Sequence, residues 1–463
     1  MKNMTLAQIA EACGGHLFEN GLQTTKEVSG VVVDSRKVEK DFLFIATVGE
    51  RVDGHDFINS SFEKGALAVI CERVPAEPKG CCILVKDSFQ ALKDIAKWYR
   101  MQLTIKVVGI TGSVGKTSTK EFISSVLSKK YNVLKTEGNF NNEIGMPLTI
   151  LRIQDEHEVA VLEMGISDFG EMHRLSEIAK PDICVITNIG QCHLENLGSR
   201  EGILKAKTEI FDFMNENGRV CINGDDDMLA TIKDVKGYQP VRFGLGTSNE
   251  IYATRIKSKG LFGSICEIHL GGEIIHANIP LPGEHMVFNA LAATSVGSLL
   301  GLSEEEIALG IASVKPLGGR SNIIRHENYT IIDDCYNANP VSMKAAIDLL
   351  SMADTRKVAI LGDMGELGSN ESALHQEVGA YAAGKTNLLI CIGKLSRYMY
   401  EGAAQALHKA KVEENTQIDS KLYYFETREE FILQIPSLIL ENDTILVKAS
   451  HFMGFEQIVE ALQ

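Results

Sequence analysis

The stretch GITGSVGKTSTKEF, from Gly109 to Phe122, restricts the fold of this chain more than any other feature. It follows the apolar run IKVVGIT, and together they predict a strand, a glycine-rich turn and a helix. The backbone N–H groups of such a turn and the positive end of the following helix form a nest for an anion. The stretch therefore predicts a site for a nucleoside triphosphate, made by Gly112, Ser113, Val114, Gly115, Lys116, Thr117 and Ser118.

Two side chains of this loop have predicted roles. Lys116 is expected to reach the β and γ phosphates, and the Thr117 hydroxyl is expected to bind Mg²⁺. The stretch departs from the usual G-x-x-x-x-G-K-[ST] pattern, because Ile110 occupies the first glycine position and Gly109 lies one residue earlier. A glycine-rich turn with a purely structural role is the alternative.

A second anchor for the metal is expected at the end of a neighbouring strand. The apolar run VAVLEMG contains Glu163 at its end, and VITNIGQCHLENLGS places Asn188 and His193 after the next strand. The carboxyl ends of parallel strands form the edge at which open α/β sheets bind ligands. Glu163 is therefore a candidate magnesium ligand. A carboxylate that only shapes a turn and a histidine with a structural role are the alternatives.

The segment ILKAKTEIF contains two lysines whose roles the residues alone leave open. Lys205 and Lys207 are two positions apart, so on a helix they lie on different faces. Two solvated lysines are the plain interpretation of this spacing.

Composition excludes several classes of protein. The chain has 463 residues and a formal net charge of -15 without a basic block, which argues against nucleic acid and anionic membranes as partners. No run approaches about 18 apolar residues, so no membrane insertion is expected. The ten cysteines form no C-x-x-C pair, which argues against structural zinc and for a reducing, cytoplasmic location.

The pattern of apolar runs predicts an α/β protein of three domains, over residues 1–84, 85–314 and 315–463. Short interleaved runs predict a small N-terminal α/β domain. Apolar strands alternating with helices predict a central parallel sheet of the phosphate-loop type with flanking helices, followed by antiparallel strands at residues 250–281. Further strand-then-helix units predict a C-terminal Rossmann-like open sheet.

Ordered motifs along almost the whole chain resemble those of the Mur ligase family. They are DSRKV, GERVDGHDF, GITGSVGKTS, GNFNNEIGMP, LEMG, TNIGQCHLE, AKTEIF, INGDDD, GEHMVFNALAA, GGRSN, DDCYNANPVSM, LGDMGELG and LVKASHFM. YNANP with GDMGELG is most similar to the member that adds a dipeptide. The resemblance implies ATP-dependent amide formation between UDP-N-acetylmuramoyl-tripeptide and D-alanyl-D-alanine through an acyl phosphate, with release of ADP and phosphate.

The resemblance also implies metal ligands and catalytic groups. Thr117 and Glu163 would hold a first Mg²⁺. Lys207, carbamylated by CO₂, would hold a second Mg²⁺ with His193. Lys116, Lys207 and His193 would then be the catalytic residues, and no protein nucleophile is required.

Further residues are implied in binding. Asn289 would contact adenine, Arg320 the γ-phosphate and Asp334 the ribose, so that the central domain binds ATP and the C-terminal domain closes on it. In the N-terminal domain Ser35 and Arg36 would meet the UDP part. Asn337 and Asn339 are candidates near the incoming dipeptide.

The chain also departs from the family pattern at several places. Met286 replaces an asparagine, and Ala449 and His451 replace a glycine and an arginine. The role of Asp53, Gly54 and His55 is open between substrate contact and a turn. The chain is expected to act as a monomer.

Three other functions compete with this interpretation. The ligase that adds the third peptide residue and folylpolyglutamate synthetase share the loop, glutamate and lysine features. DSR and DGH in the first region argue against the folate enzyme. A non-catalytic ATP-binding subunit is disfavoured because Lys116, Thr117, Glu163, His193 and Lys207 are all present.

Overall fold

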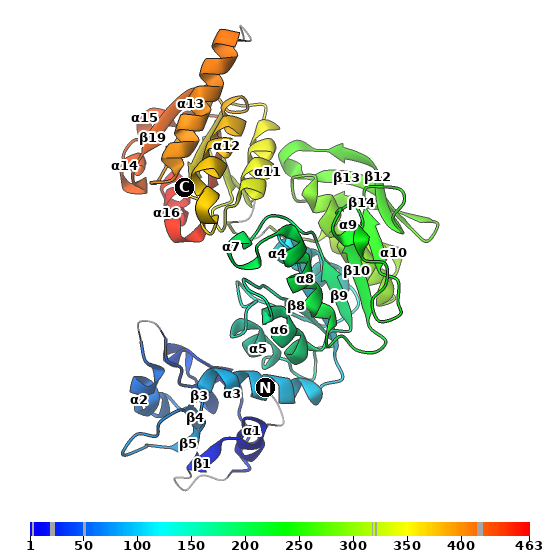
Figure 1. The fold of residues 1–463 in the computed structure, drawn as a ribbon, viewed down its shortest axis with the longest axis vertical. Helices are drawn as coiled ribbons and strands as arrows, with labels where there is room; N and C mark the ends of the chain where they lie inside the picture. Colours follow the sequence, from blue (N-terminus) through cyan, green and yellow to red (C-terminus); the bar gives the residue numbers. More distant parts are fainter. Residues whose placement is uncertain (2–3, 19–23, 50–51, 317, 320–321, 414–419) are drawn as a thin grey trace. The chain divides into compact units, whose positions relative to one another are not determined.

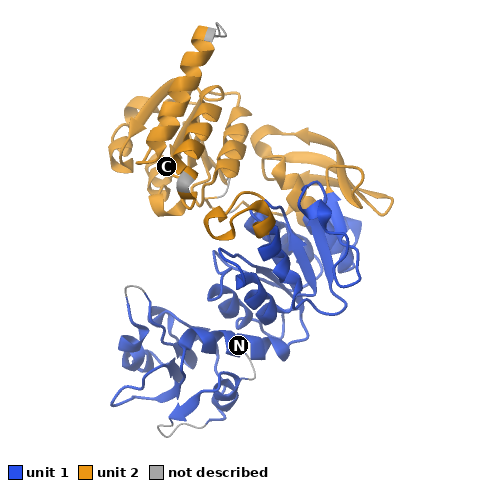
Figure 2. Ribbon diagram, in the orientation of Figure 1, with its two compact units in different colours: residues 1–189, 204–243, 292–307 blue, residues 190–203, 244–291, 308–463 orange. Residues whose placement is uncertain are grey.

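The computed structural model describes residues 1, 4–18, 24–49, 52–316, 318–319, 322–413 and 420–463. Figure 2 shows two compact units, residues 1–189, 204–243 and 292–307, and residues 190–203, 244–291 and 308–463. The predicted α/β class is confirmed. The boundaries 1–84, 85–314 and 315–463 stay a prediction, because the two units divide the chain differently.

The N-terminal sheet, drawn in blue in Figure 1, has the strand order β1-β5-β4-β3-β2. Its strands pair in parallel except β1, which runs antiparallel to β5. One core cluster packs Val38, Phe44 and Ile58 against Val69 and Cys82. The elements are α1 (Leu6–Ala12), β1 (His16–Phe18), β2 (Gly30–Val32), η1 (Ser35–Lys37), β3 (Phe42–Ile45), η2 (Gly54–Phe57), α2 (Ile58–Glu63), β4 (Ala68–Cys71) and β5 (Cys81–Leu84).

Helix α3 (Ser88–Met101) connects this sheet to the next one within the first unit. Asp87 caps it, because its Oδ1 accepts from the Gln90 N–H at 2.9 Å. The helix packs against α1 and β4 of the N-terminal layer and against α5 and α6 of the next one. Its buried residues recur at helical spacing and form one apolar stripe: Ala91, Leu92, Ile95, Ala96 and Tyr99.

The central sheet of the first unit has parallel strands in the order β11-β10-β9-β6-β8-β7. Strand β6 lies between β8 and β9, so the order reverses at β6 and leaves a crevice at its carboxyl end. The elements are β6 (Lys106–Thr111), α4 (Lys116–Leu127), β7 (Val133–Lys135), α5 (Gly145–Ile150), β8 (Val159–Glu163), α6 (Glu171–Ala179), β9 (Ile183–Ile186), α8 (Arg200–Thr208), η3 (Glu209–Phe211), β10 (Arg219–Asn223), η4 (Leu229–Thr231) and β11 (Val241–Gly244).

The predicted antiparallel segment is confirmed in the second unit. Strands β12, β13 and β14 pair antiparallel, with Ile268 opposite Ile275. The elements of this part are α7 (Leu194–Leu197), β12 (Ile251–Ser258), η5 (Gly260–Phe262), β13 (Ser264–Leu270), β14 (Glu273–Ile279), α9 (His285–Leu299) and α10 (Glu304–Ala312).

The C-terminal sheet has the order β15-β16-β20-β17-β18-β19 and is parallel except at β15. Alternate strand residues enter two separate cores, one under α11, α12 and α13 and one beside α14 and α16. Burial on both faces explains why its strands are uniformly apolar. The elements are β15 (Asn322–Arg325), β16 (Thr330–Asp333), α11 (Pro340–Ser351), β17 (Lys357–Gly362), η6 (Gly368–Asn370), α12 (Glu371–Ala383), β18 (Leu388–Ile392), α13 (Ser396–Glu413), β19 (Lys421–Phe425), α14 (Arg428–Ile432), α15 (Ile435–Leu438), β20 (Thr444–Lys448), η7 (His451–Met453) and α16 (Glu456–Leu462).

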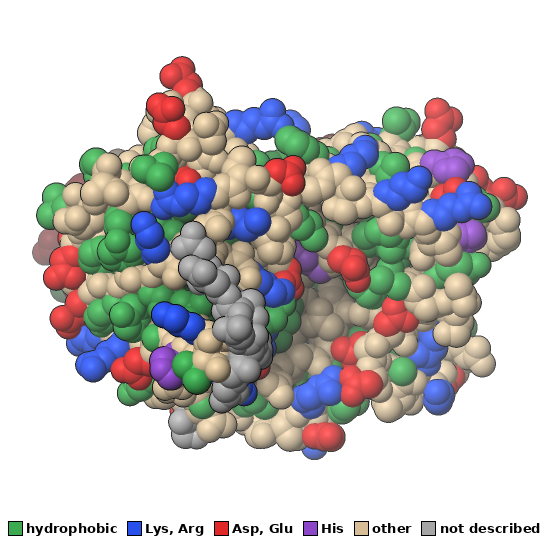
Figure 3. All heavy atoms as spheres, turned by 90° about the horizontal axis from the view of Figure 1, so that it is seen from above, with side chains coloured by type: hydrophobic (Ala, Val, Ile, Leu, Met, Phe, Trp, Pro, Cys, Tyr) green, Lys and Arg blue, Asp and Glu red, His purple; other side chains and the backbone are tan. Residues whose placement is uncertain are grey.

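The surface shows no segregation of charge on the face drawn in Figure 3, where Lys and Arg side chains are interspersed with Asp and Glu. None of the helices in the described part of the chain is long and apolar enough to span a membrane.

Candidate active site

The predicted phosphate loop is present between β6 and α4. Gly112 has φ +149° and Gly115 has φ +83°, conformations that L side chains rarely adopt. A Cβ at Gly112 would lie 2.0 Å from Thr187 Oγ1, so only glycine fits there. Gly115 caps α4, and the first N–H groups of that helix have no partner within the helix. They are therefore available to an anion.

The loop is held from the neighbouring strand β9. The N–H of Ser113 donates to Asn188 O at 3.0 Å, and the N–H of Val114 donates to Asn188 Oδ1 at 2.9 Å. In return Asn188 Nδ2 and Thr187 Oγ1 both donate to Val114 O, at 2.9 and 2.7 Å. Two N–H groups of the expected anion nest, those of Ser113 and Val114, therefore donate to Asn188 and not to a ligand. Asn188 is a structural clamp for the loop.

The Lys116 side chain folds back over the phosphate loop. Its Nζ donates to Gly112 O at 2.9 Å, so its charge is already beside the predicted phosphate position.

The two side chains predicted to hold the first metal, Thr117 and Glu163, come together at the carboxyl end of β8. Thr117 Oγ1 donates to Glu163 Oε1 at 3.0 Å, and both side chains are buried. Asn141 Nδ2 also donates to Oε1 at 3.0 Å. Glu163 Oε2 is buried and, among the described residues, has no hydrogen-bond partner. A buried carboxylate oxygen left in this state beside a hydroxyl fits a hard cation such as Mg²⁺.

The described residues contain no group of three or more His, Cys, Asp or Glu side chains that could hold a metal by themselves. A magnesium ion at Thr117 and Glu163 would therefore be completed by water and by phosphate oxygens, which is how Mg²⁺ is often bound. The residues present fit the ion under that condition.

The structure distinguishes the two lysines of α8. Lys207 is buried, with 1 % of its surface exposed, whereas Lys205 is exposed and its Nζ lies 6.0 Å from the Phe169 ring centroid. The expectation that they lie on different faces is confirmed. His193 precedes α7 with φ +51° and belongs to the second unit, whereas Lys207, Thr117 and Glu163 belong to the first. Their joint role stays a prediction.

In the C-terminal sheet, Lys448 organises the segment that carries Asp334 and Asn337. It is buried at the end of β20, and its Nζ donates to Asp334 Oδ2 at 2.7 Å and to Asn337 O at 2.9 Å. Asn339 Oδ1 accepts from the Ser342 N–H at 2.9 Å and caps α11. This cap is a sufficient structural reason for Asn339, while Asn337 is exposed and open to a ligand.

The remaining predicted nucleotide residues have different outcomes. Asn289 is buried on α9, where its Nδ2 lies 3.3 Å from Met286 Sδ. Met286 thus packs where the family pattern has an amide. Arg320 lies outside the described residues.

The two departures after β20 are also placed. Ala449 is part of the core beside Phe455. His451 is exposed, stacks on Tyr336 with ring centroids 5.4 Å apart, and has its Nδ1 3.0 Å from Glu456 Oε1.

The N-terminal candidates lie at the carboxyl end of β2. Arg36 is exposed and makes a bidentate ion pair with Asp34, whose pKa it lowers. The Ser35 carbonyl accepts from Lys64 Nζ at 2.8 Å. Both remain accessible to a ligand.

The segment DGHDF has a structural role. Asp53 Oδ1 accepts from the N–H and from Nδ1 of His55, and His55 Nε2 accepts from the Glu72 N–H at 2.9 Å. A Cβ at Gly54 would lie 2.8 Å from the Thr47 backbone. The alternative that this segment shapes a turn is supported.

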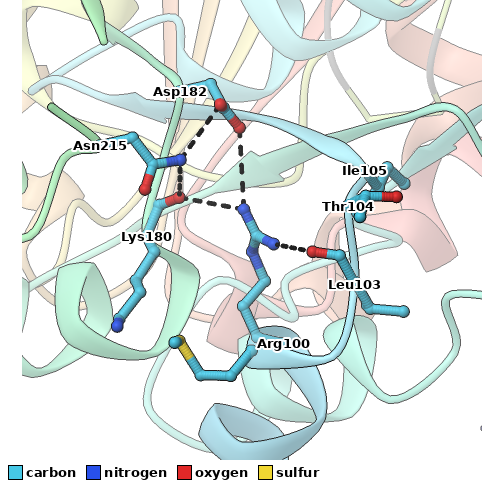
Figure 4. Close-up of a pocket in the computed structure, with 8 residues that line it drawn as sticks. Arg100, Leu103, Thr104, Ile105, Lys180, Asp182 and Asn215 are labelled. Atoms are coloured by element: carbon cyan, nitrogen blue, oxygen red, sulfur yellow. Dashed lines mark hydrogen bonds and ion pairs between the residues drawn. The ribbon is translucent and has the colours of Figure 1, made fainter. Parts of the chain in front are cut away.

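One cavity of about 390 Å³ lies away from this chemistry, at the amino ends of β6 and β9 (Figure 4). Arg100 is buried beside it and donates to the carbonyls of Ala179, Lys180 and Leu103. Asn215 Nδ2 lies 3.1 Å from Asp182 Oδ1 in the same network. Its polar groups satisfy one another and cap the end of α6, so the cavity has a structural explanation.

His375 holds the segment after β17. It is fully buried; its Nε2 accepts from the Met364 N–H at 3.0 Å and its Nδ1 donates to Glu371 O at 2.7 Å. Burial lowers the pKa of this imidazole from its ordinary 6.5. This histidine carries no motif signal, because its partner Met364 lies 11 residues away.

His375 predicts a pH-dependent stability. The unfolded chain binds the proton more readily, so below pH 6.5 the free energy of unfolding should fall, by up to about 1.4 kcal/mol per pH unit, until the lowered pKa is reached. Urea unfolding between pH 5 and 8 measures this slope. His375→Gln should reduce the slope and leave the part due to His285, whose pKa burial also lowers, whereas His408→Gln, at an exposed position, should not change it. An unchanged slope in His375→Gln would contradict the assignment.

The fold and this site define the class: an α/β nucleotide-binding protein with a phosphate loop and a strand-end carboxylate. Three domain families match the chain: the Mur ligase family, catalytic domain, over residues 27–99, the Mur ligase middle domain over residues 110–297, and the Mur ligase, glutamate ligase domain over residues 319–451. The chain belongs to the Mur ligase family.

Individual relatives show which members of the family this chain is similar to. UDP-N-acetylmuramoyl-tripeptide–D-alanyl-D-alanine ligase of Bacillus subtilis is 39% identical over 100% of this chain and 99% of its own. A crystal structure of MurF from Acinetobacter baumannii has a TM-score of 0.88 at 32% identity, covering 99% of this chain and 98% of that one. MurF ligase from Thermotoga maritima in complex with ADP has a TM-score of 0.79 at 29% identity, covering 93% of this chain and 96% of that one.

Proposed function

We propose that this chain is an ATP-dependent ligase that joins D-alanyl-D-alanine to UDP-N-acetylmuramoyl-tripeptide and releases ADP and phosphate. The observation that carries the proposal is the phosphate loop clamped beside Thr117 and Glu163, in a chain with 39% identity to a ligase named for these substrates. The Thermotoga maritima relative was solved in complex with ADP, which supports ATP as the nucleotide substrate of this chain.

The chemistry follows from what the residues supply. Transfer of the γ-phosphoryl group to the tripeptide carboxylate brings two anions together, which cations and aligned donors must offset. Lys116 and the first N–H groups of α4 would bind the phosphates, and Thr117 and Glu163 would hold Mg²⁺. The bound metal neutralises charge on the phosphate oxygens. The neutral amine of the dipeptide then displaces phosphate from the acyl phosphate and forms the amide.

A carbamate on Lys207 is part of this proposal. An ammonium would repel Mg²⁺, whereas a carbamate would be an anion able to hold it, and His193 is the other ligand that the proposal assigns. The burial of Lys207 and the exposure of Lys205 favour Lys207 as the modified residue.

The substrates are assigned to further residues by the same proposal. Ser35 and Arg36 meet the UDP part, Asn289, Arg320 and Asp334 the nucleotide, and Asn337 and Asn339 the dipeptide side. The domains over residues 1–84, 85–314 and 315–463 bind, in that order, the sugar nucleotide, ATP, and the nucleotide with the dipeptide.

The protein is proposed to act as a cytoplasmic monomer. None of the ten cysteines is joined in a disulfide, which is typical of a reducing compartment.

A product assay tests the proposed function. Purified protein with ATP, Mg²⁺, UDP-N-acetylmuramoyl-tripeptide and D-alanyl-D-alanine should form ADP and phosphate in equal amounts with the amide product. Omitting either carbon substrate should abolish phosphate release. Formation of AMP and pyrophosphate, or phosphate release that does not depend on D-alanyl-D-alanine, would refute the proposed function.

A further inference from the structure

Lys120 is a charged residue in an unusual place. It lies on α4 one turn after Lys116, and only 2 % of its surface is exposed. Lysine is almost never this buried unless it is paired. Nothing in the reaction proposed above uses it.

A chain of alternating charges runs through Lys120 inside the first unit. Its Nζ lies 3.8 Å from Glu163 Oε2 and 3.3 Å from Glu121 Oε1. The other oxygen of Glu121 pairs with Lys135, whose side chain is partly exposed. Lys120 therefore divides its charge between a structural carboxylate and the candidate metal ligand.

Lys120 is not needed to aim Glu163. Thr117 and Asn141 fix Oε1 of that carboxylate, and the Glu163 N–H donates to Thr136 Oγ1 at 3.0 Å. At 3.8 Å the ammonium lies beyond hydrogen-bond distance of Oε2. What Lys120 adds is a positive charge beside the one carboxylate oxygen that is left for a cation.

We propose that Lys120 sets the affinity of the first magnesium site, and that it keeps this affinity low. Its charge competes with Mg²⁺ for Glu163, so the metal binds well only when the phosphates add their own negative charge, and it leaves with ADP. Lys120 acts on the metal only through Glu163, by placing its charge beside Oε2. The inference rests on the proposed role of Thr117 and Glu163 as metal ligands.

The test measures the affinity of the full-length protein for Mn²⁺ in the presence of saturating ADP. Electron paramagnetic resonance monitors the binding. Lys120→Met should bind Mn²⁺ about tenfold more tightly, because the competing charge near Glu163 is gone. Glu121→Gln should bind it at least about threefold more weakly, because the whole charge of Lys120 then acts on Glu163. The exposed Lys129→Met, just beyond α4, should equal the parent.

A second measurement uses the metal-free protein. In a chelator, Lys120→Met should melt at a lower temperature than the parent, since Glu163 is left buried without a counter-charge. Mn²⁺ with ADP should raise its melting temperature by more than it raises that of the parent. Lys120→Arg should resemble the parent in both measurements.

Weaker or unchanged Mn²⁺ binding in Lys120→Met overturns the proposal. If that variant does not fold, Glu121→Gln decides, because tighter or unchanged binding there overturns it equally. The readout needs neither carbon substrate. The two proposals can therefore fail separately. If the variants show the expected changes in Mn²⁺ affinity but the protein forms no amide, the ligase activity is refuted and the role of Lys120 is not.

Discussion

Replacing Lys207 by alanine should lower turnover by on the order of 10³-fold, or about 4 kcal/mol of activation free energy. The substitution removes the anion that the proposed carbamate would supply to a second metal. Lys207 is buried on α8, so solvent does not replace the lost group. The measurement is the rate of phosphate release with both carbon substrates present. A small carboxylic acid such as acetate should restore part of the rate by occupying the vacated position.

The matched control for Lys207 is its neighbour on the same helix. Lys205→Ala should retain nearly the parent rate, because Lys205 is exposed. If Lys205→Ala is inactive and Lys207→Ala is active, the assignment of the carbamate to Lys207 is wrong. The carbamate would be excluded from the mechanism by two results together: mass spectrometry finds no carbamate on the parent protein, and acetate does not restore the rate of Lys207→Ala.

Lys116→Met should lower kcat/KM by on the order of 10²–10³-fold, a loss typical for one donor aimed at developing charge. In the structure Lys116 Nζ donates to Gly112 O, and the loop keeps its clamp to Asn188 without it. The fold should therefore survive, and the loss should fall on phosphoryl transfer. Steady-state kinetics with varied ATP measures the effect, and a thermal melt verifies folding.

The control for Lys116 is Lys129→Met, which removes a charge of the same sign from an exposed position just beyond the same helix. A parent-like rate in Lys116→Met would contradict the role of this ammonium at the phosphates.

Local patterns were enough to predict the order of elements and the phosphate loop. The loop after β6 and Glu163 at the end of β8 each follow from residues close in sequence. Uniform apolar strands also indicated parallel sheets covered on both faces, as the two cores of the C-terminal sheet confirm.

Contacts between distant residues could not be predicted in this way. Asn188 clamps a loop 74 positions away, and Lys448 binds Asp334 across 114 positions. Lys120 had no motif, because its partner Glu163 becomes a neighbour only when β8 pairs beside β6. Spacing alone left Lys205 and Lys207 open and only the family resemblance pointed to Lys207; the burial of Lys207 is the structural difference between the two.

The clamp from Asn188 and Thr187 has a consequence for inhibitor discovery. Because β9 holds Val114 through hydrogen bonds that involve no ligand, the loop has its shape before a phosphate arrives. A segment that is already ordered loses little conformational entropy on binding. Small, rigid phosphate mimics should thus bind the empty loop without first reshaping it, so that fragment screening on the ligand-free protein reports on the same surface that the nucleotide meets.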